Sequence, residues 1–177
     1  MQARLSATDL ACRRGERLLF RKLTLDLRPG DMLEIRGPNG VGKTSLLRIL
    51  AGLAEPFAGE VQRKGEVGLV DARHALDLDR RLGDTLNFWG RLDGCTDPAA
   101  AIAATQIETL LDIPVGYLST GQKQRAAIAR LLARHRPIWL LDEAFAGLDT
   151  AAQGMLADLI REHCETGGLC VFVSHQP

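Results

Sequence analysis

Apolar residues recur along the chain with two different periods, which predict strands and helices. Leu23, Leu25 and Leu27 alternate with polar residues and predict a half-buried antiparallel strand over residues 17–27. Apolar residues at helical spacing predict a helix over residues 45–51. Further strands are expected at residues 3–10, 32–36, 60–63, 67–70, 138–141 and 169–173, and further helices at 84–92, 97–113, 123–134 and 149–160.

The order of these elements predicts an α/β fold. Ile138 to Leu141 is a continuous apolar run, typical of a strand that is buried on both faces of a parallel sheet. Strands that alternate with helices favour such a sheet. Polar turns are expected at residues 13–16 and 29–31, and residues 71–83 are rich in charge and predict an irregular loop. Residues about 80–117 then form a helical insertion in a single domain of 177 residues.

Composition narrows the functional classes. The 22 basic and 22 acidic residues balance, so no global charge favours binding to nucleic acid or to anionic lipid. The four cysteines form no zinc-binding pattern and are expected to be free thiols. The first residues lack the apolar core of a signal peptide, and no run has the length of a membrane helix. We therefore expect a soluble cytoplasmic protein that reaches a membrane only through a partner.

The first candidate functional motif is the stretch GPNGVGKTS, which fits the pattern of a P-loop. Its glycines allow close approach of the backbone to a ligand, and the N–H groups at a helix N-terminus can bind phosphate oxygens. Lys43 would contact the outer phosphates, and the Thr44 hydroxyl would bind Mg²⁺. The alternative is a glycine-rich turn that binds nothing. The expected nucleotide-binding residues here are Gly37, Pro38, Asn39, Gly40, Val41, Gly42, Lys43, Thr44 and Ser45.

Two acidic residues follow the apolar run at 138–141. A carboxylate at the carboxyl end of a buried strand faces the same crevice as the phosphate loop. Asp142 is therefore a candidate ligand of Mg²⁺, and Glu143 is a candidate general base that polarises the attacking water. The alternative is a strand end that is merely capped by acids.

Leu118 to Gln122, read LSTGQ, resembles the LSGGQ signature of ABC ATPases, with Thr120 in place of the first glycine. Phosphate loop, helical insertion, signature, acidic strand end, Gly147-Leu148-Asp149 and His175 follow in the order typical of that family. The resemblance covers essentially the whole chain and implies a P-loop NTPase fold of the ABC type, with an antiparallel β edge and a small helical subdomain. Shorter stretches are similar to the ATP-binding subunits of the haem exporters of cytochrome c biogenesis: residues 10–14, 118–132, 139–143, 167–168 and 174–177.

The resemblance implies two ATP molecules held between two copies of the domain. Ser119, Gly121 and Gln122 of one copy would contact the ATP of the other, because a helix N-terminus is an anion site. His175 would contact the γ-phosphate, and Asp149 would couple the two sites. The homodimer would bind ATP and Mg²⁺ and join integral membrane subunits at the cytoplasmic face of the inner membrane. It would energise haem-related export; an ABC ATPase of another transporter and an ABC ATPase outside transport are the alternatives.

Several positions depart from the family pattern. Arg14 lies where an aromatic residue usually stacks on adenine, and its guanidinium could stack on the base or be solvated. Arg73 aligns with the usual glutamine, and Ala144 replaces a proline. The chain ends earlier than most members, so a C-terminal segment is expected to be missing.

Other residues have plainer expected roles. Cys12 and Cys170 are expected to be buried. Phe88 and Trp89 either lie in the core or line a groove for a helix of a membrane subunit. Residues 162–165 are expected to form a solvated helix end, rather than a metal or haem site, and Arg130, Arg134 and Arg136 a solvated face.

Overall fold

The computed structural model describes residues 3–71, 74–94 and 97–174. Arg73 and His175 lie outside these residues. The chain divides into two compact units. The first comprises Met1–Leu69, Arg136–Ala144 and Ile160–Pro177, and the second comprises Val70–His135 and Phe145–Leu159. The expected helical insertion, residues 80–117, falls within the second unit.

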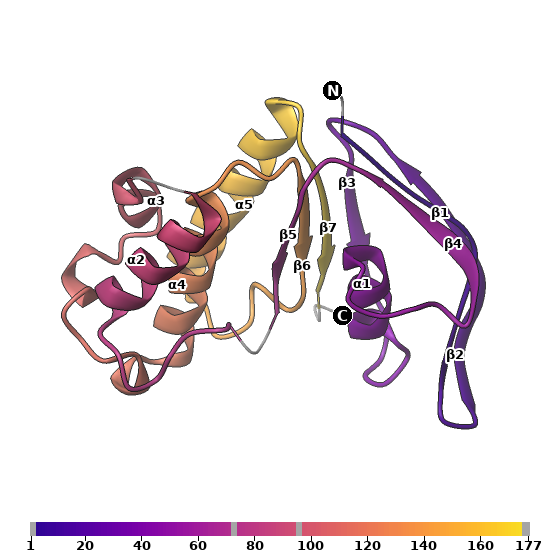
Figure 1. The fold of residues 1–177 in the computed structure, drawn as a ribbon, viewed down its shortest axis with the longest axis horizontal. Helices are drawn as coiled ribbons and strands as arrows, with labels where there is room; N and C mark the ends of the chain where they lie inside the picture. Colours follow the sequence, from indigo (N-terminus) through magenta and orange to yellow (C-terminus); the bar gives the residue numbers. More distant parts are fainter. Residues whose placement is uncertain (1–2, 72–73, 95–96, 175–177) are drawn as a thin grey trace. The chain divides into compact units, whose positions relative to one another are not determined.

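Most of the strands belong to the first unit and form two sheets (Figure 1). The antiparallel sheet has the order β2-β1-β4, and the other sheet has the order β3-β7-β6-β5. In the latter, β7 runs parallel to both β3 and β6, as the apolar run of β6 predicts. The strands are β1 (Arg4–Arg14), β2 (Arg17–Leu27), β3 (Met32–Ile35), β4 (Ala58–Lys64), β5 (Val67–Val70), β6 (Ile138–Leu141) and β7 (Leu169–Val173).

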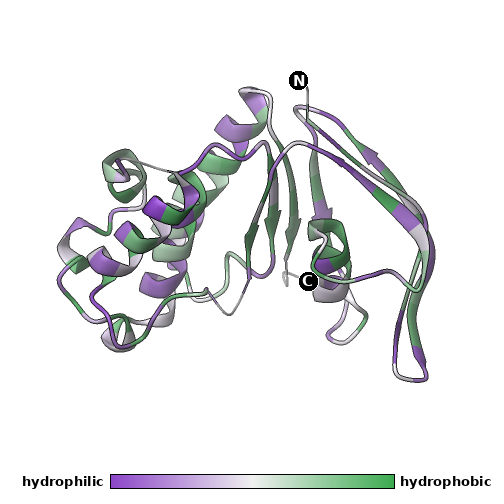
Figure 2. Ribbon diagram, viewed as in Figure 1, coloured by the Kyte–Doolittle hydropathy of each residue, from purple (hydrophilic) through white to green (hydrophobic). Residues whose placement is uncertain are grey.

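The core of the first unit brings together β1, the helix α1 (Lys43–Ala51), β6 and β7. Leu47 and Leu50 of α1, Leu140 of β6 and Val171 of β7 are fully buried in it. Each such side chain contributes about 1.5–3 kcal/mol by leaving water, which anchors α1 between the sheets. Figure 2 shows β6 and β7 as hydrophobic ribbons, consistent with burial on both faces.

The hairpin of β1 and β2 differs from the expected one. Arg13 and Arg14 continue β1, so the turn contains only Gly15 and Glu16. Gly15 has φ 58°, the left-handed conformation that glycine adopts without strain in tight turns. The expected half-buried strand at residues 17–27 is confirmed as β2.

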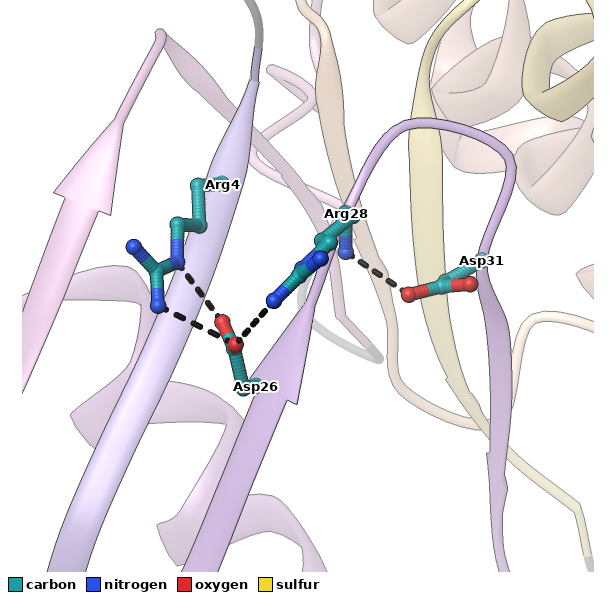
Figure 3. A network of polar contacts seen from close by, with 4 residues as sticks. All are labelled: Arg4, Asp26, Arg28 and Asp31. Carbon is teal, nitrogen blue, oxygen red and sulfur yellow. Dashed lines mark hydrogen bonds and ion pairs between the residues drawn. The ribbon is translucent and has the colours of Figure 1, made fainter.

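A polar network fixes the end of this hairpin and the turn into β3 (Figure 3). The Arg4 guanidinium donates to both carboxylate oxygens of Asp26, at 2.7 and 3.0 Å, and Arg28 Nη2 donates to the same carboxylate at 3.4 Å. The Arg4 hydrogen bond holds the pKa of Asp26 below its usual value. The Arg28 N–H donates to Asp31 Oδ2 at 2.7 Å, which closes the turn. These exposed pairs add little stability but define the path of the chain into β3.

The second unit is helical and has its own core. It contains α2 (Leu82–Asp93), α3 (Ala99–Ala104), 3₁₀ turns at Glu108–Leu110 and Val115–Tyr117, α4 (Thr120–Leu132), and the start of α5 (Thr150–Glu165). Leu82, Leu86, Ile107, Leu110 and Val115 are buried together with Ala126 and Ala129 of α4.

One helix predicted in this unit does not form as expected. Residues 97–113 do not form one helix, because α3 ends at Ala104 and Gln106 has φ 54°. A left-handed residue cannot continue a right-handed helix. The irregular path after it places Ile107 and Leu110 in the core.

Two expected solvated positions are packed instead. His163 of α5 is buried and stacks on Trp139 of β6, with ring centroids 3.8 Å apart and planes 6° from parallel. The solvated helix end expected at residues 162–165 is therefore wrong for His163, and also for Cys164, which is buried. Arg130 of α4 lies 3.5 Å above the Trp89 ring of α2, so it does not belong to a purely solvated face. Among the described residues, no helix is long and apolar enough to cross a bilayer.

Candidate nucleotide-binding site

The phosphate loop connects β3 to α1, which is the strand, loop and helix context that the motif requires. Gly42 precedes the helix with φ 109°, a conformation that L side chains rarely adopt. A Cβ at Gly42 would lie 3.1 Å from Leu19 Cβ and 3.2 Å from Phe20 Cδ1. Glycine at this position therefore meets both a backbone and a packing requirement, and it brings the loop against β2.

Lys43 is held within the loop. Its side chain is buried, and the ammonium donates to the carbonyl oxygens of Gly37 at 2.6 Å and Pro38 at 3.1 Å. These carbonyls keep the charge at the mouth of the loop, beside the N-terminus of α1, where the first N–H groups have no acceptor within the helix. Positive charge, helix N-terminus and glycine backbone thus converge where phosphates would bind.

A cavity of about 420 Å³ opens beside this loop. It brings Glu143, predicted as the general base, together with Arg14 and with six of the nine predicted phosphate-binding residues; Gly37, Pro38 and Val41 do not line it. Sequence reasoning missed two of its lining residues, Arg17 and Leu19 of β2; the two-residue turn, which pairs Arg14 with Arg17, was the signal for them. The lining residues are Arg14, Arg17, Leu19, Asn39, Gly40, Gly42, Lys43, Thr44, Ser45 and Glu143.

The two acidic residues that follow β6, Asp142 and Glu143, differ in their exposure to solvent. Asp142 is buried with 6% of its surface exposed, whereas Glu143 is half-buried and lines the cavity. Glu143 also has φ 54°, which costs a non-glycine residue about 1–2 kcal/mol. Such strain is kept where the surroundings fix a side chain for a task.

The donor set fits Mg²⁺ carried by a nucleotide. Thr44 offers a hydroxyl and Asp142 a carboxylate, and Mg²⁺ is usually bound by one or two protein oxygens plus phosphates and water. The described residues contain no cluster of three His, Cys, Asp or Glu side chains that could hold a metal alone. The described residues therefore do not form a metal site made of protein ligands alone.

The signature residues lie in the second unit, at the N-terminus of α4. Ser119 is the N-cap: its hydroxyl accepts from the Gln122 N–H at 3.2 Å, and its own N–H donates to Gln122 Oε1 at 2.8 Å. Asp149 caps α5 by accepting from the Ala152 N–H at 2.8 Å, a structural task that accounts for this residue type.

The structure therefore brings together only some of the residues that were predicted to bind ATP. Residues of the loop, Arg14 and Glu143 share one cavity, whereas Ser119, Gly121, Gln122 and Asp149 belong to the other unit. His175 lies outside the described residues.

Sequence comparison supports the resemblance. A family model described as ABC transporter matches residues 20–146. The chain is 51% identical over 173 residues to the "Cytochrome c biogenesis ATP-binding export protein CcmA" of Novosphingobium aromaticivorans, covering 98% of this chain and 89% of that protein. It is 45% identical to the protein of the same name in Sphingopyxis alaskensis, covering 99% of this chain and 91% of the other.

Solved structures share the fold. An inward-facing putative metal-chelate type ABC transporter aligns with a TM-score of 0.84 at 26% identity, over 100% of this chain and 75% of that chain. An ATP-binding subunit of an ABC transporter aligns with a TM-score of 0.87 at 21% identity, over 97% and 79% of the two chains. The expected ABC-type fold is confirmed.

Proposed function

Because the chain belongs to the ABC transporter family and is an ATP-binding subunit of that family, we propose that it energises haem-related export in cytochrome c maturation. The main support for ATP hydrolysis is that residues of the phosphate loop and Glu143 line one cavity. The substrate rests on the names of relatives that match nearly the whole chain at 45–51% identity.

The phosphate loop binds the nucleotide through its backbone N–H groups and Lys43. Thr44 and Asp142 would hold a Mg²⁺ ion, which would neutralise negative charge on the phosphates of the nucleotide. Glu143 orients a water molecule and accepts its proton as the water attacks the γ-phosphate. General-base catalysis of this kind contributes about 10²–10⁴-fold.

Two chains close around two nucleotides in this mechanism. One chain presents the Ser119 hydroxyl and the Gly121 N–H to the γ-phosphate bound by the other. Both groups lie at the N-terminus of α4, where the helix dipole favours an anion. Gln122 holds Ser119 in place through the capping box, and hydrolysis removes the anion that joins the chains.

The membrane partner docks on the exposed face of α2. Phe88 and Leu92 are 51% and 65% exposed and lie beside Arg80, Asp84 and Arg91 around one hollow. Of the two aromatic residues considered for a groove, Phe88 therefore lines one, whereas Trp89 is covered by Arg130. An apolar centre with a charged rim fits a short helix of CcmB- or CcmC-like integral subunits, which would hold the chain at the cytoplasmic face of the inner membrane.

The experiment co-expresses the chain with its candidate membrane subunits and measures co-purification and ATP hydrolysis. We expect a complex whose ATPase activity is lost in Lys43→Ala. Phe88→Glu should release the chain from the membrane subunits but leave its own nucleotide binding intact. Assembly with subunits of an unrelated transporter, and none with CcmB- or CcmC-like subunits, would reject haem export while keeping the ATPase assignment.

A further inference from the structure

The Arg63 side chain of β4 reaches the carboxyl end of α1. Its Nε donates to the Leu50 carbonyl oxygen at 2.7 Å, and its Nη2 donates to the Ile49 carbonyl oxygen at 2.6 Å. Arg63 is the register partner of Leu5, which is fully buried in the core that includes α1, so both side chains project toward the helix. The guanidinium fork therefore ties the antiparallel sheet to the last turn of α1.

The end of α1 is shaped to receive this side chain. The last four carbonyls of a helix have no partner within it, and those of Ile49 and Leu50 are among them. Gly52 ends the helix with φ 79°, and a Cβ at this position would lie 3.3 Å from Arg63 Cζ. Glycine here leaves room for the guanidinium, and the helix dipole favours a cation at this end.

The opposite end of the same helix carries the predicted phosphate-binding residues. Lys43 and Thr44 are the first two residues of α1, so a slide or rotation of the helix moves both. Burial of Leu47 and Leu50 holds the helix in the core. Hydrophobic attraction is non-directional, however, so it resists a small slide along the axis less than hydrogen bonds of defined geometry do. The Arg63 fork supplies that directional constraint.

We propose that Arg63 is a positioning residue for nucleotide binding, which holds α1 so that Lys43 and Thr44 meet the phosphates. The inference rests on the proposed function, because it takes the loop to bind a triphosphate. Position rather than charge explains the effect. α1 has 9 residues and is about 13 Å long. Arg63 is exposed, and interactions between exposed charges are largely screened beyond roughly 8 Å at physiological ionic strength.

The test is calorimetric titration of the full chain with MgATP and with Mg-tripolyphosphate, which lacks a base. Arg63→Met should weaken the binding of both by about tenfold, as when one molecule in ten keeps α1 in the competent position. In steady-state hydrolysis KM should rise while kcat stays at the wild-type value, because the bound nucleotide restores the position of α1. Lys64→Met is the matched control: Lys64 is the next residue of β4, exposed and on the opposite face, and its loss should change neither affinity.

Arg63→Lys separates geometry from charge. Lysine keeps the cation but not the planar fork, so it should restore wild-type affinity only in part. Full rescue by lysine would overturn the proposal. A merely structural role would do the same: Arg63→Met would then lower the urea midpoint of the nucleotide-free chain and leave both dissociation constants unchanged. A wild-type chain that binds neither ligand would instead reject the proposed function itself.

Gly52→Ala perturbs the same contact from the helix. Its methyl group should displace the guanidinium and weaken MgATP binding in the wild-type background. In the Arg63→Met background this further loss should disappear, because no fork remains to be displaced. The strain of alanine at φ 79° is present in both backgrounds and cancels in the comparison. Additive losses would overturn the fork. If Arg63→Met does not fold, unchanged MgATP affinity in both Arg63→Lys and Gly52→Ala would also overturn it.

Discussion

Gly121 lies so close to Gly147 that a Cβ at position 121 would be 2.5 Å from the Gly147 carbonyl oxygen. Thr120, in place of the family's first signature glycine, also packs here, because its Cγ2 would lie 3.1 Å from a Cβ on Gly147. The start of α4 is thus packed against the loop before α5 within one chain. Gly121 is required by this contact, independently of any role toward a second chain.

Gly121→Ala should therefore destabilise the isolated chain. The added methyl meets a backbone oxygen that cannot rotate away, and overpacking of this kind costs about 1–3 kcal/mol. Urea unfolding of the nucleotide-free protein measures the loss. Gly154→Ala on α5 is the matched control: nothing lies within 4 Å of its Cβ, so it should stabilise by about 0.5–1 kcal/mol. Equal stability of the two variants would show that Gly121 is not constrained by packing.

Glu143→Gln should slow ATP turnover by about 10²-fold or more while ATP still binds. Glutamine keeps the size of the side chain and one acceptor oxygen but cannot accept the proton of the attacking water. The backbone at φ 54° carries the same strain in both forms, so the fold should not change. Steady-state hydrolysis and equilibrium ATP binding are compared with Glu165→Gln, an exposed acid at the end of α5. Turnover near the wild-type rate would remove Glu143 as the base.

Much of the fold is local in origin and could be read from the sequence. The alternation of Leu23, Leu25 and Leu27 predicts β2, and the apolar run of β6 predicts a doubly buried strand. The helix predicted over residues 45–51 corresponds to α1, which Gly52 ends in the left-handed conformation. These features depend on neighbours in the sequence, so pattern alone is sufficient.

The errors have a common physical cause, which is contact between residues far apart in the chain. His163 is at the polar end of a helix, yet Trp139 covers it from a strand 24 positions earlier. Residues after Ala104 look helical because Ile107 and Leu110 have helical spacing, but the core of the second unit selects 3₁₀ turns. Arg17 joins the cavity only because the hairpin pairs it with Arg14. No local pattern carries such information.

Ser119→Arg should allow ATP to bind but prevent an ATP-dependent dimer. The long cation would fill the space that the γ-phosphate of the partner chain occupies in the proposed closed state. The experiment uses the Glu143→Gln background, which retains ATP, and measures mass by light scattering with and without MgATP. An ATP-dependent dimer of the Ser119→Arg, Glu143→Gln double variant would contradict the shared-site model.

Ser119 also caps α4, so its replacement has a second effect that needs a control. Loss of a serine cap costs about 1 kcal/mol. Ser119→Thr keeps both the cap and the hydroxyl, and in the same background it should still dimerise with ATP. Loss of dimerisation in both variants would point to the helix end rather than to the phosphate contact.

Arg130→Ala should destabilise the second unit through the loss of its contact with Trp89. The guanidinium lies 3.5 Å from the ring centroid, and such contacts contribute about 0.5–1 kcal/mol when partly exposed. Arg130→Lys keeps the charge but not the planar stack, so it should retain only part of that stability. Urea unfolding compares the three proteins, and identical midpoints would show that the stack contributes nothing.

Cys164 and Cys170 should resist alkylation in the folded chain. Both thiols are buried, and burial raises the pKa of each because it disfavours the thiolate. Cys164 Sγ donates to the Asp31 carbonyl oxygen at 3.6 Å, which fixes it further. Iodoacetamide labelling with peptide mass spectrometry, with and without urea, should show both cysteines modified only in urea. Since these folded pKa values exceed the unfolded ones, the thiols favour the folded state below about pH 8.5, and stability should fall as the pH rises above it. Native labelling at the rate of the unfolded chain would contradict the burial of the pair.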